Sequence, residues 1–150
     1  MSSSPAGIAA RYRPGMDPAA WRTRLAAARV ATLATLDGQG RPHLVPVCFV
    51  CLDDRIVSVV DDKPKRTTAL ARLEHIEARP DVCLLVHHYE EDWDALWWVR
   101  VDGTATVRDA PDPAMRRALA AKYEPYAARP PGGAAIVITP TRWRGWSAAD

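Results

Sequence analysis

A cluster of cationic side chains lies in residues 61–67, whose sequence is Asp-Asp-Lys-Pro-Lys-Arg-Thr. Lys63, Lys65 and Arg66 fall where a β-branched run ends and a helical pattern begins. Backbone N–H groups and the helix dipole at such a junction favour an anion, and cationic side chains add charge-assisted hydrogen bonds to phosphate or carboxylate oxygens. Two of the three lysines of the chain lie here. The segment therefore predicts an anion site, and a solvated turn in which the aspartates pair with the lysines is the alternative.

Trp98 and Arg100 form a second candidate contact, because they alternate with apolar residues in the run 95–108. Alternation in a strand places them together on the face opposite the core. An indole beside a guanidinium suits a planar, anionic ligand or a neighbouring subunit. Both interpretations hold together if the site lies between subunits.

Other residues that could bind a metal or take part in catalysis give weaker signals. Cys48 and Cys51 form a Cys-x-x-Cys, but in the extended strand that we expect here they face opposite sides of the sheet and cannot chelate. No second Cys or His pair has zinc spacing, so we expect no metal site. The sequence also lacks Gly-x-Ser-x-Gly, P-loop and Gly-x-Gly-x-x-Gly motifs, so no motif supports a hydrolase or nucleotide-triphosphatase function.

Composition limits the class of protein. The chain has 150 residues, 48% of them apolar and 25% charged, as expected for one folded domain. A net charge of +2 with interspersed acids argues against nucleic-acid binding. No apolar run could span a bilayer, no signal pattern begins the chain, and three cysteines suit a reducing compartment, so we expect a cytoplasmic protein without a membrane partner. Residues 1–15 read as a flexible N-terminal tail, and residues 16–150 as the folded domain.

Hydrophobic periodicity predicts three helices and six strands. In chain order these are a helix over 17–29, strands over 30–36, 42–52 and 55–60, a helix from after Pro64 to about Ala78, strands over 82–89 and 95–108, a helix over 112–127 and a strand over 134–146. The first three strands should begin an antiparallel meander, and Pro140 implies an edge or a bulge in the last strand. We expect a mainly β (α+β) fold, a six-stranded antiparallel barrel with short flanking helices, because closure removes exposed strand edges.

The chain resembles the pyridoxamine 5'-phosphate oxidase-like split β-barrels, and within them the actinobacterial branch that uses the deazaflavin coenzyme F420. The resemblance covers about residues 21–147 and rests on residues 29–35, 40–46, 60–67, 96–103 and 138–146. It implies a homodimer with two cofactor sites at the subunit interface. Pyridoxamine-phosphate oxidases proper continue past the last strand with a basic segment, whereas this sequence ends at Asp150, so we do not expect oxidation of vitamin B6.

The resemblance also assigns cofactor-binding residues. Lys63, Lys65 and Arg66 would hold the cofactor phosphate. Residues on the second and third strands would flank the ring, and two on the fifth would add contacts; these are Pro46, Val47, Ser58, Val60, Trp98 and Arg100. No catalytic side chain is assigned, since a bound deazaflavin supplies the reactivity itself.

The resulting hypothesis is an F420-dependent oxidoreductase that transfers a hydride between the deazaflavin and an unidentified small molecule. An FMN-dependent flavin reductase or oxidase of the same fold is the alternative. A third possibility, of another class, is a non-enzymatic protein that binds the cofactor or haem. Haem would need a ligand such as His43 or His88.

Overall fold

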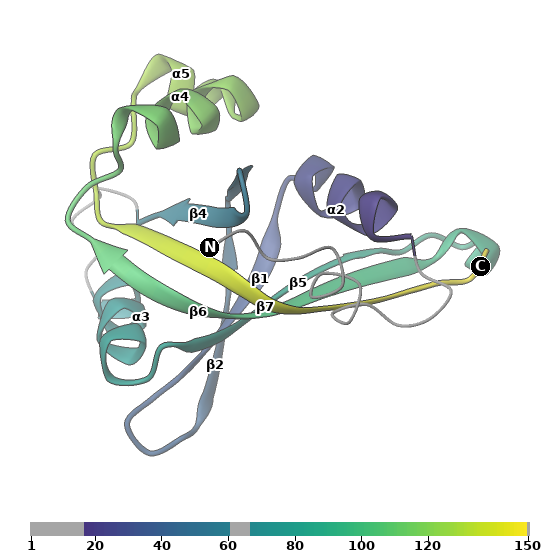
Figure 1. Ribbon diagram of the computed structural model, residues 1–150, viewed down its shortest axis with the longest axis horizontal. Coiled ribbons are helices and arrows are strands. Elements are labelled where there is room, and N and C mark those ends of the chain that lie inside the picture. Colours follow the sequence, from purple (N-terminus) through teal and green to yellow (C-terminus); the bar gives the residue numbers. More distant parts are fainter. Residues whose placement is uncertain (1–16, 61–66, 150) are drawn as a thin grey trace.

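A computed structural model describes residues 17–60 and 67–149 of the chain, with the backbone alone for residues 67–70. Its centre is a seven-stranded antiparallel sheet in the order β2-β1-β5-β6-β7-β4-β3 (Figure 1). The strands are β1 (Ala31–Leu36), β2 (Pro42–Val47), β3 (Val50–Leu52), β4 (Arg55–Val59), β5 (Asp81–His88), β6 (Trp97–Arg108) and β7 (Ala135–Ser147). The helices are α2 (Pro18–Ala27), α3 (Thr67–Ala78), α4 (Pro113–Lys122) and α5 (Glu124–Ala128), with a 3-10 turn η1 (Trp93–Ala95). Residues 1–16 and 61–66 lie outside this description.

The run that was expected to form one strand over residues 42–52 forms two, β2 and β3. β2 pairs only with β1, and β3 only with β4, so the two lie at opposite ends of the sheet order. Only Cys48 and Phe49 separate them in the chain. The sheet must therefore curl until its ends meet, which makes a barrel of seven strands in place of six. The expected meander was wrong, although both hairpins within it are present.

Capping explains where α2 begins. The Asp17 side chain accepts a hydrogen bond from the backbone N–H of Ala19 (3.0 Å), and Pro18 takes the first helical position. Trp21 and Leu25, one turn apart, are buried against the sheet. The helix predicted from Asp17 and Pro18 is thus confirmed.

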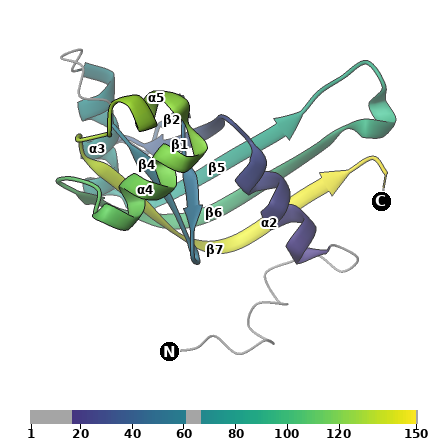
Figure 2. The ribbon, with the colours of Figure 1, turned by 90° about the horizontal axis from the view of Figure 1, so that it is seen from above.

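Strand alternation divides the apolar residues between two cores. Along β4, Ile56 lies in the first cluster, inside the barrel, whereas Val57 and Val59 lie in the second. The second cluster is completed by Met115 and Leu119 of α4, so this helix covers the outside of β4 and β7. Figure 2 shows α4 and α5 stacked in front of that end of the sheet.

A bulge interrupts the pairing of β6 with β7. Asp102 pairs with Arg142 and Gly103 pairs with Pro140, so Thr141 has no partner across the ladder. This confirms the bulge predicted from Pro140, and since β7 lies between β6 and β4, the edge alternative is wrong. A Cβ on Gly103 would lie 2.6 Å from the carbonyl oxygen of Thr139, which explains the glycine at this close approach.

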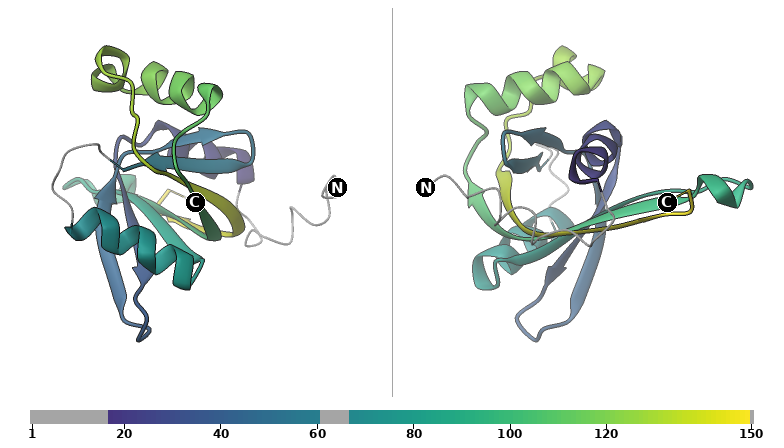
Figure 3. Two further views of the ribbon diagram at one scale, coloured as in Figure 1. Left: turned by 90° about the vertical axis from the view of Figure 1, so that its left-hand side faces the viewer. Right: turned by 45° about the vertical axis from the view of Figure 1, so that its right-hand side comes forward.

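Beyond the barrel, β5, β6 and β7 continue as a three-stranded arm. β1 pairs with β5 only over Cys83–Leu85, whereas β6 pairs with β7 as far as Trp97 and Ser147. Figure 3 shows the arm projecting from the barrel, with η1 at its tip. In the described residues no helix is long and apolar enough to cross a membrane.

Gly103→Ala should destabilise the fold by about 1 to 3 kcal/mol, because the added methyl group would force β6 and β7 apart. Urea denaturation followed by tryptophan fluorescence measures the change. Gly38→Ala is the matched control, since a Cβ there meets no atom within 4 Å, and it should stay within about 0.5 kcal/mol of the wild type. Equal stability of the two variants would contradict the close approach.

Candidate functional site

The described residues leave one face of the sheet uncovered where β2, β1, β5, β6 and β7 lie side by side. Register places its side chains in rows that cross the strands. One row runs from Pro46 through Thr32, Leu85 and Arg100 to Arg144. These side chains are exposed or half-buried, in contrast to the buried residues that alternate with them. We call this surface the open face.

A second row of the open face is aromatic. His87 lies opposite Trp98, and Trp98 lies opposite Trp146, on the arm. Trp146 is 45% exposed, and Leu44, on the same face of β2, is 67% exposed. Apolar side chains of this size rarely stay in contact with water over a continuous sheet face, so the open face has the character of an interaction surface.

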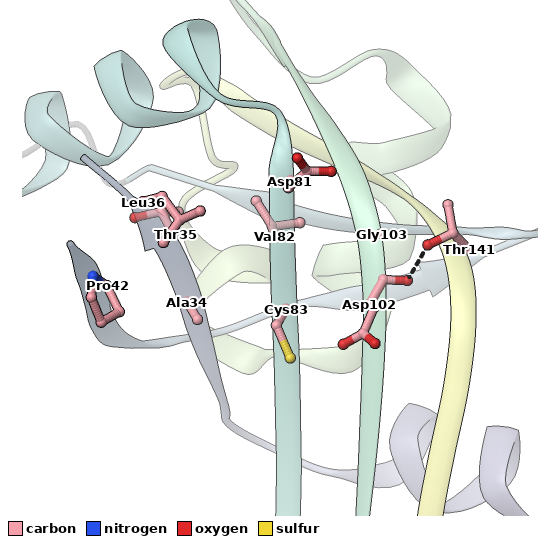
Figure 4. Close-up of a pocket in the computed structure, with 10 residues that line it drawn as sticks. All are labelled: Ala34, Thr35, Leu36, Pro42, Asp81, Val82, Cys83, Asp102, Gly103 and Thr141. Carbon is pink, nitrogen blue, oxygen red and sulfur yellow. Dashed lines mark hydrogen bonds between the residues drawn. The ribbon is translucent and has the colours of Figure 1, made fainter. Parts of the chain in front are cut away.

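A pocket of about 320 Å³ lies on the open face, over β1, β5 and β6 beside the bulge (Figure 4). Its walls are mainly apolar and include Ala34 and Pro42. Figure 4 shows Cys83 and Asp102 next to each other on adjacent strands, and the Thr141 hydroxyl donating to the backbone carbonyl of Asp102 (3.1 Å). The residue inserted at the bulge therefore fixes one edge of the pocket.

The polar groups of the pocket are held in place. Arg100 Nε lies 3.2 Å from Asp102 Oδ1, an ion pair whose angle is not that of a hydrogen bond. Burial, together with a hydrogen bond and negative charge from Asp102, raises the pKa of the Cys83 thiol to about 12. The thiol therefore stays protonated at neutral pH and is no nucleophile. The pocket can bind and orient a ligand, and its described residues offer no covalent catalysis.

The residues predicted to contact a cofactor fall into three groups. Pro46, Trp98 and Arg100 lie on the open face, with β1 and β5 between Pro46 and the other two, and this confirms the shared face of Trp98 and Arg100. Val47, Ser58 and Val60 are instead buried on the interior side of their strands, with side chains 5%, 2% and 9% exposed. The structure does not bring these three side chains onto the open face. Lys63, Lys65 and Arg66 lie outside the described residues.

The Cys-x-x-Cys is also placed differently from expectation. Cys48 lies after the end of β2 and is exposed, whereas Cys51 lies in β3 and is half-buried. One continuous strand does not hold them, because the chain turns at Cys48 and Phe49. Within residues 17–60 and 67–149, no group of three His, Cys, Asp or Glu side chains could hold a metal ion.

His43 belongs to a polar contact that sequence reasoning missed. Its Nε2 lies 3.3 Å from Asp37 Oδ2, and its ring lies 4.6 Å from that of His75, whose Nδ1 is 3.0 Å from Thr35 Oγ1. Hydrogen bonds, the largest from the backbone N–H of Arg41, hold the pKa of the Asp37 carboxyl well below its usual value. These contacts join the β1–β2 hairpin to α3 across 40 positions of sequence, a separation at which no local pattern could show them.

His88, the other histidine considered as a haem ligand, lies on the arm. It contacts the carboxylate of Glu90 and stacks on Trp97 with ring centroids 6.1 Å apart. Both His43 and His88 are thus engaged with carboxylates rather than aimed into the pocket of the open face.

Comparison with known protein families shows to which family the chain belongs. A family model described as pyridoxamine 5'-phosphate oxidase matches residues 17–147. The chain belongs to the pyridoxamine 5'-phosphate oxidase family. No curated protein matches the chain.

Solved structures share this family's split barrel. A conserved hypothetical protein from Mycobacterium tuberculosis is 20% identical, with a TM-score of 0.70 over 89% of this chain and 86% of that one. A FAD-binding protein from Mesorhizobium loti is 20% identical, with a TM-score of 0.66 over 87% and 92%. The heme storage protein HutZ from Vibrio cholerae is 16% identical, with a TM-score of 0.60 over 87% and 93%. At such identities the likeness establishes the fold, and it confirms the expected split barrel.

Asp102→Asn should make Cys83 more reactive, because the substitution removes a negative charge that raises the thiol pKa. Alkylation by iodoacetamide at mildly alkaline pH should accelerate roughly three- to fourfold for each unit by which the pKa falls, because the thiolate fraction rises while the nucleophilicity of the thiolate declines. Mass spectrometry of the modified peptides measures the rate. Exposed Cys48 is the internal control and should react equally fast in both proteins. An unchanged rate at Cys83 would show that Asp102 does not act on the thiol.

Proposed function

We propose that the chain is an F420-dependent oxidoreductase, which binds the deazaflavin at the open face and transfers a hydride between it and an unidentified small molecule. Membership of the pyridoxamine 5'-phosphate oxidase family supports an oxidoreductase. A solved structure of the same fold is named as a FAD-binding protein, which favours a flavin-type cofactor.

The observation that carries the proposal is the common face of Pro46, Trp98 and Arg100. Two come from β6 and one from β2. The strand register puts Arg100 in the row of Pro46, with β1 and β5 between them, and Trp98 in the next row. Trp98 is half-buried, so its ring is held while one part remains accessible. Such a surface combines an aromatic ring with a guanidinium group, which suits a planar and anionic ring system.

The phosphate of the cofactor is assigned to Lys63, Lys65 and Arg66, which directly precede α3 in sequence. Arg72 of α3 adds a further cation. Its Nε is buried without a hydrogen-bond partner among the described residues, and burial lowers the pKa of its guanidinium. A bound anion would satisfy this group. Lys63, Lys65 and Arg66 suit the phosphate and the acidic tail of F420, and they also suit the single phosphate of FMN.

We further propose that two copies of the chain form a homodimer through the open face, with a cofactor site at each end of the interface. An uncovered aromatic row on a sheet is self-complementary when two copies meet about a twofold axis. Charges favour the same arrangement, since Arg142 and Arg144 lie at one edge of the face and Glu90, Glu91 and Asp92 follow the end of β5. The partner would cover Trp146 and Leu44, the most exposed large apolar residues of this face.

In this mechanism the protein's residues bind, orient and exclude water. When bound, the deazaflavin supplies a ring carbon that accepts or donates a hydride. The aromatic row would press the substrate against the ring, and Arg100, held by Asp102, would fix negative charge near it. The protonated Cys83 thiol adds polar surface without reacting.

An FMN-dependent reductase or oxidase is the second candidate, favoured by the FAD-binding name of a solved relative. A haem-binding protein has its counterpart in the heme storage protein from Vibrio cholerae. The carboxylates beside His43 and His88 make these histidines less suited to ligate iron, so we rank haem last.

Lys65→Ala combined with Arg66→Ala should weaken cofactor binding about 100-fold or more, because each charge-assisted contact contributes about 1.5 to 3 kcal/mol. Titration of the purified protein with F420 and with FMN, followed by fluorescence, measures both dissociation constants. Arg116→Ala with Arg117→Ala removes two exposed arginines of α4 and is the charge-matched control. Tight binding of FMN without binding of F420 would overturn the leading proposal, and unchanged affinity in the first variant would make residues 61–67 a solvated turn.

Trp98→Glu should separate the dimer, since it places a charge in the centre of the aromatic row. Sedimentation equilibrium should show a dimer for the wild type and a dimer dissociation constant raised about 100-fold or more for the variant. Arg116→Glu, on exposed α4, should leave the dimer intact. A variant that remains fully dimeric would place the interface elsewhere.

A further inference from the structure

The turn between β2 and β3 is held by side chains from other parts of the fold. We call Cys48 and Phe49 the corner. Neither residue belongs to a strand, so their backbone groups have no ladder partners. Ser58 Oγ donates to the carbonyl of Cys48 (2.8 Å), which accounts for the buried hydroxyl of β4. The backbone N–H and carbonyl of Phe49 form hydrogen bonds with side chains at the end of α4, which is distant in sequence.

Tyr123 and Lys122 bind the backbone of Phe49. The Tyr123 hydroxyl accepts from the Phe49 N–H (3.1 Å) and lies 3.0 Å from its carbonyl oxygen, and the Lys122 ammonium donates to the same carbonyl (2.9 Å). The hydroxyl has one proton, and the carbonyl of Arg29 lies 2.9 Å from it. Since the Lys122 ammonium already donates to the Phe49 carbonyl, the Tyr123 hydroxyl can donate its proton to the Arg29 carbonyl. One side chain thus joins the corner to the residues before β1.

This contact is buried and preformed. Phe49 is fully buried and Tyr123 is 7% exposed. The Lys122 ammonium lies 3.9 Å from the centroid of the Phe49 ring, a cation–π contact that fixes the side chain as well as the backbone. Burial raises the pKa of the Tyr123 hydroxyl and lowers that of the Lys122 ammonium. The hydroxyl therefore keeps its proton for the Arg29 carbonyl at neutral pH.

The corner follows directly on the end of β2, where Pro46 lies on the open face. β2 is bonded on one side only, to β1, and its last paired residue is Val47. Beyond Val47 the path of the chain depends on the contacts of the corner. A ligand that lies against Pro46 on the open face needs this backbone in one position before it binds, because ordering it during binding would cost affinity.

We propose that Tyr123 and Lys122 are positioning residues for the cofactor site, which hold the corner so that the end of β2 is already in place for the cofactor ring. The inference rests on the proposed function. It adds α4, a helix that packs on the outside of β4 and β7, to the parts of the chain on which cofactor affinity depends.

Two variants and one control test the role. Tyr123→Phe removes the hydroxyl alone, and Lys122→Met keeps the stem over the Phe49 ring without the ammonium. Met115→Ala is the control, since Met115 is fully buried in the second core cluster, which includes neither Cys48 nor Phe49. It should lower the melting temperature at least as much as the other two.

Hydrogen exchange is the first readout and needs no cofactor. In Tyr123→Phe the exchange rate of the Phe49 amide should rise about tenfold more than the loss of global stability alone would cause. In Met115→Ala the exchange rate should rise only as much as the loss of global stability causes. Dissociation constants for F420 and FMN are the second readout, measured well below the melting temperature of every variant. Tyr123→Phe should weaken binding about tenfold, Lys122→Met less, and Met115→Ala less than twofold.

The outcomes separate the two proposals. Tyr123→Phe with wild-type affinity would overturn the positioning role, as would an equal loss of affinity in Met115→Ala, which would make the effect one of stability. If the wild type bound neither F420 nor FMN, the proposed function would fail, and the positioning role with it. In that case faster exchange at Phe49 would still show that Tyr123 holds the corner.

Discussion

Closure of the sheet at Cys48 and Phe49 is the constraint on which the rest of the structure depends. Two residues connect strands at opposite ends of the sheet order, so the sheet must bend until those ends meet. Closure leaves the backbone of the corner without ladder partners, and buried polar groups without partners are costly. Ser58 and Tyr123 supply the missing hydrogen bonds. The closed barrel, the position of α4 and the course of β2 therefore depend on one another through these hydrogen bonds.

Strand alternation then gives each strand two surfaces with different roles. On β6, Val99 and Val101 are buried inside, while Trp98 and Arg100, which alternate with them, face outward. The interior is closed and apolar, and the open face carries aromatic and charged groups. This division explains why residues that are neighbours in sequence, such as Pro46 and Val47, are so unequally accessible. A ligand on the open face meets one of every two residues.

The family's fold has been combined with different cofactors, as the names of the solved relatives show. The scaffold is a barrel that any of them can share, so the choice of cofactor depends on side chains at a few surface positions. In the site that we propose, those positions hold the Trp98 indole, the Arg100 guanidinium and the aromatic row on the arm. Trp98 and Arg100 are held rigidly, because β6 is paired at both residues with β5 on one side and with β7 on the other. The same rigidity makes the open face suited to a partner subunit as well as to a ligand.

Local signals in the sequence determined the elements and much of their orientation. Asp17 and Pro18 mark the start of α2, Pro140 marks the bulge, and alternation places Trp98 with Arg100, since each depends on residues close in sequence. Tertiary structure decided what local patterns cannot contain. The strand break after Val47 depends on Tyr123, 74 positions from Phe49, and the burial of Ser58 follows from closure. Extended residues look alike in sequence, and only contacts across the barrel determine which of them turn and which pair.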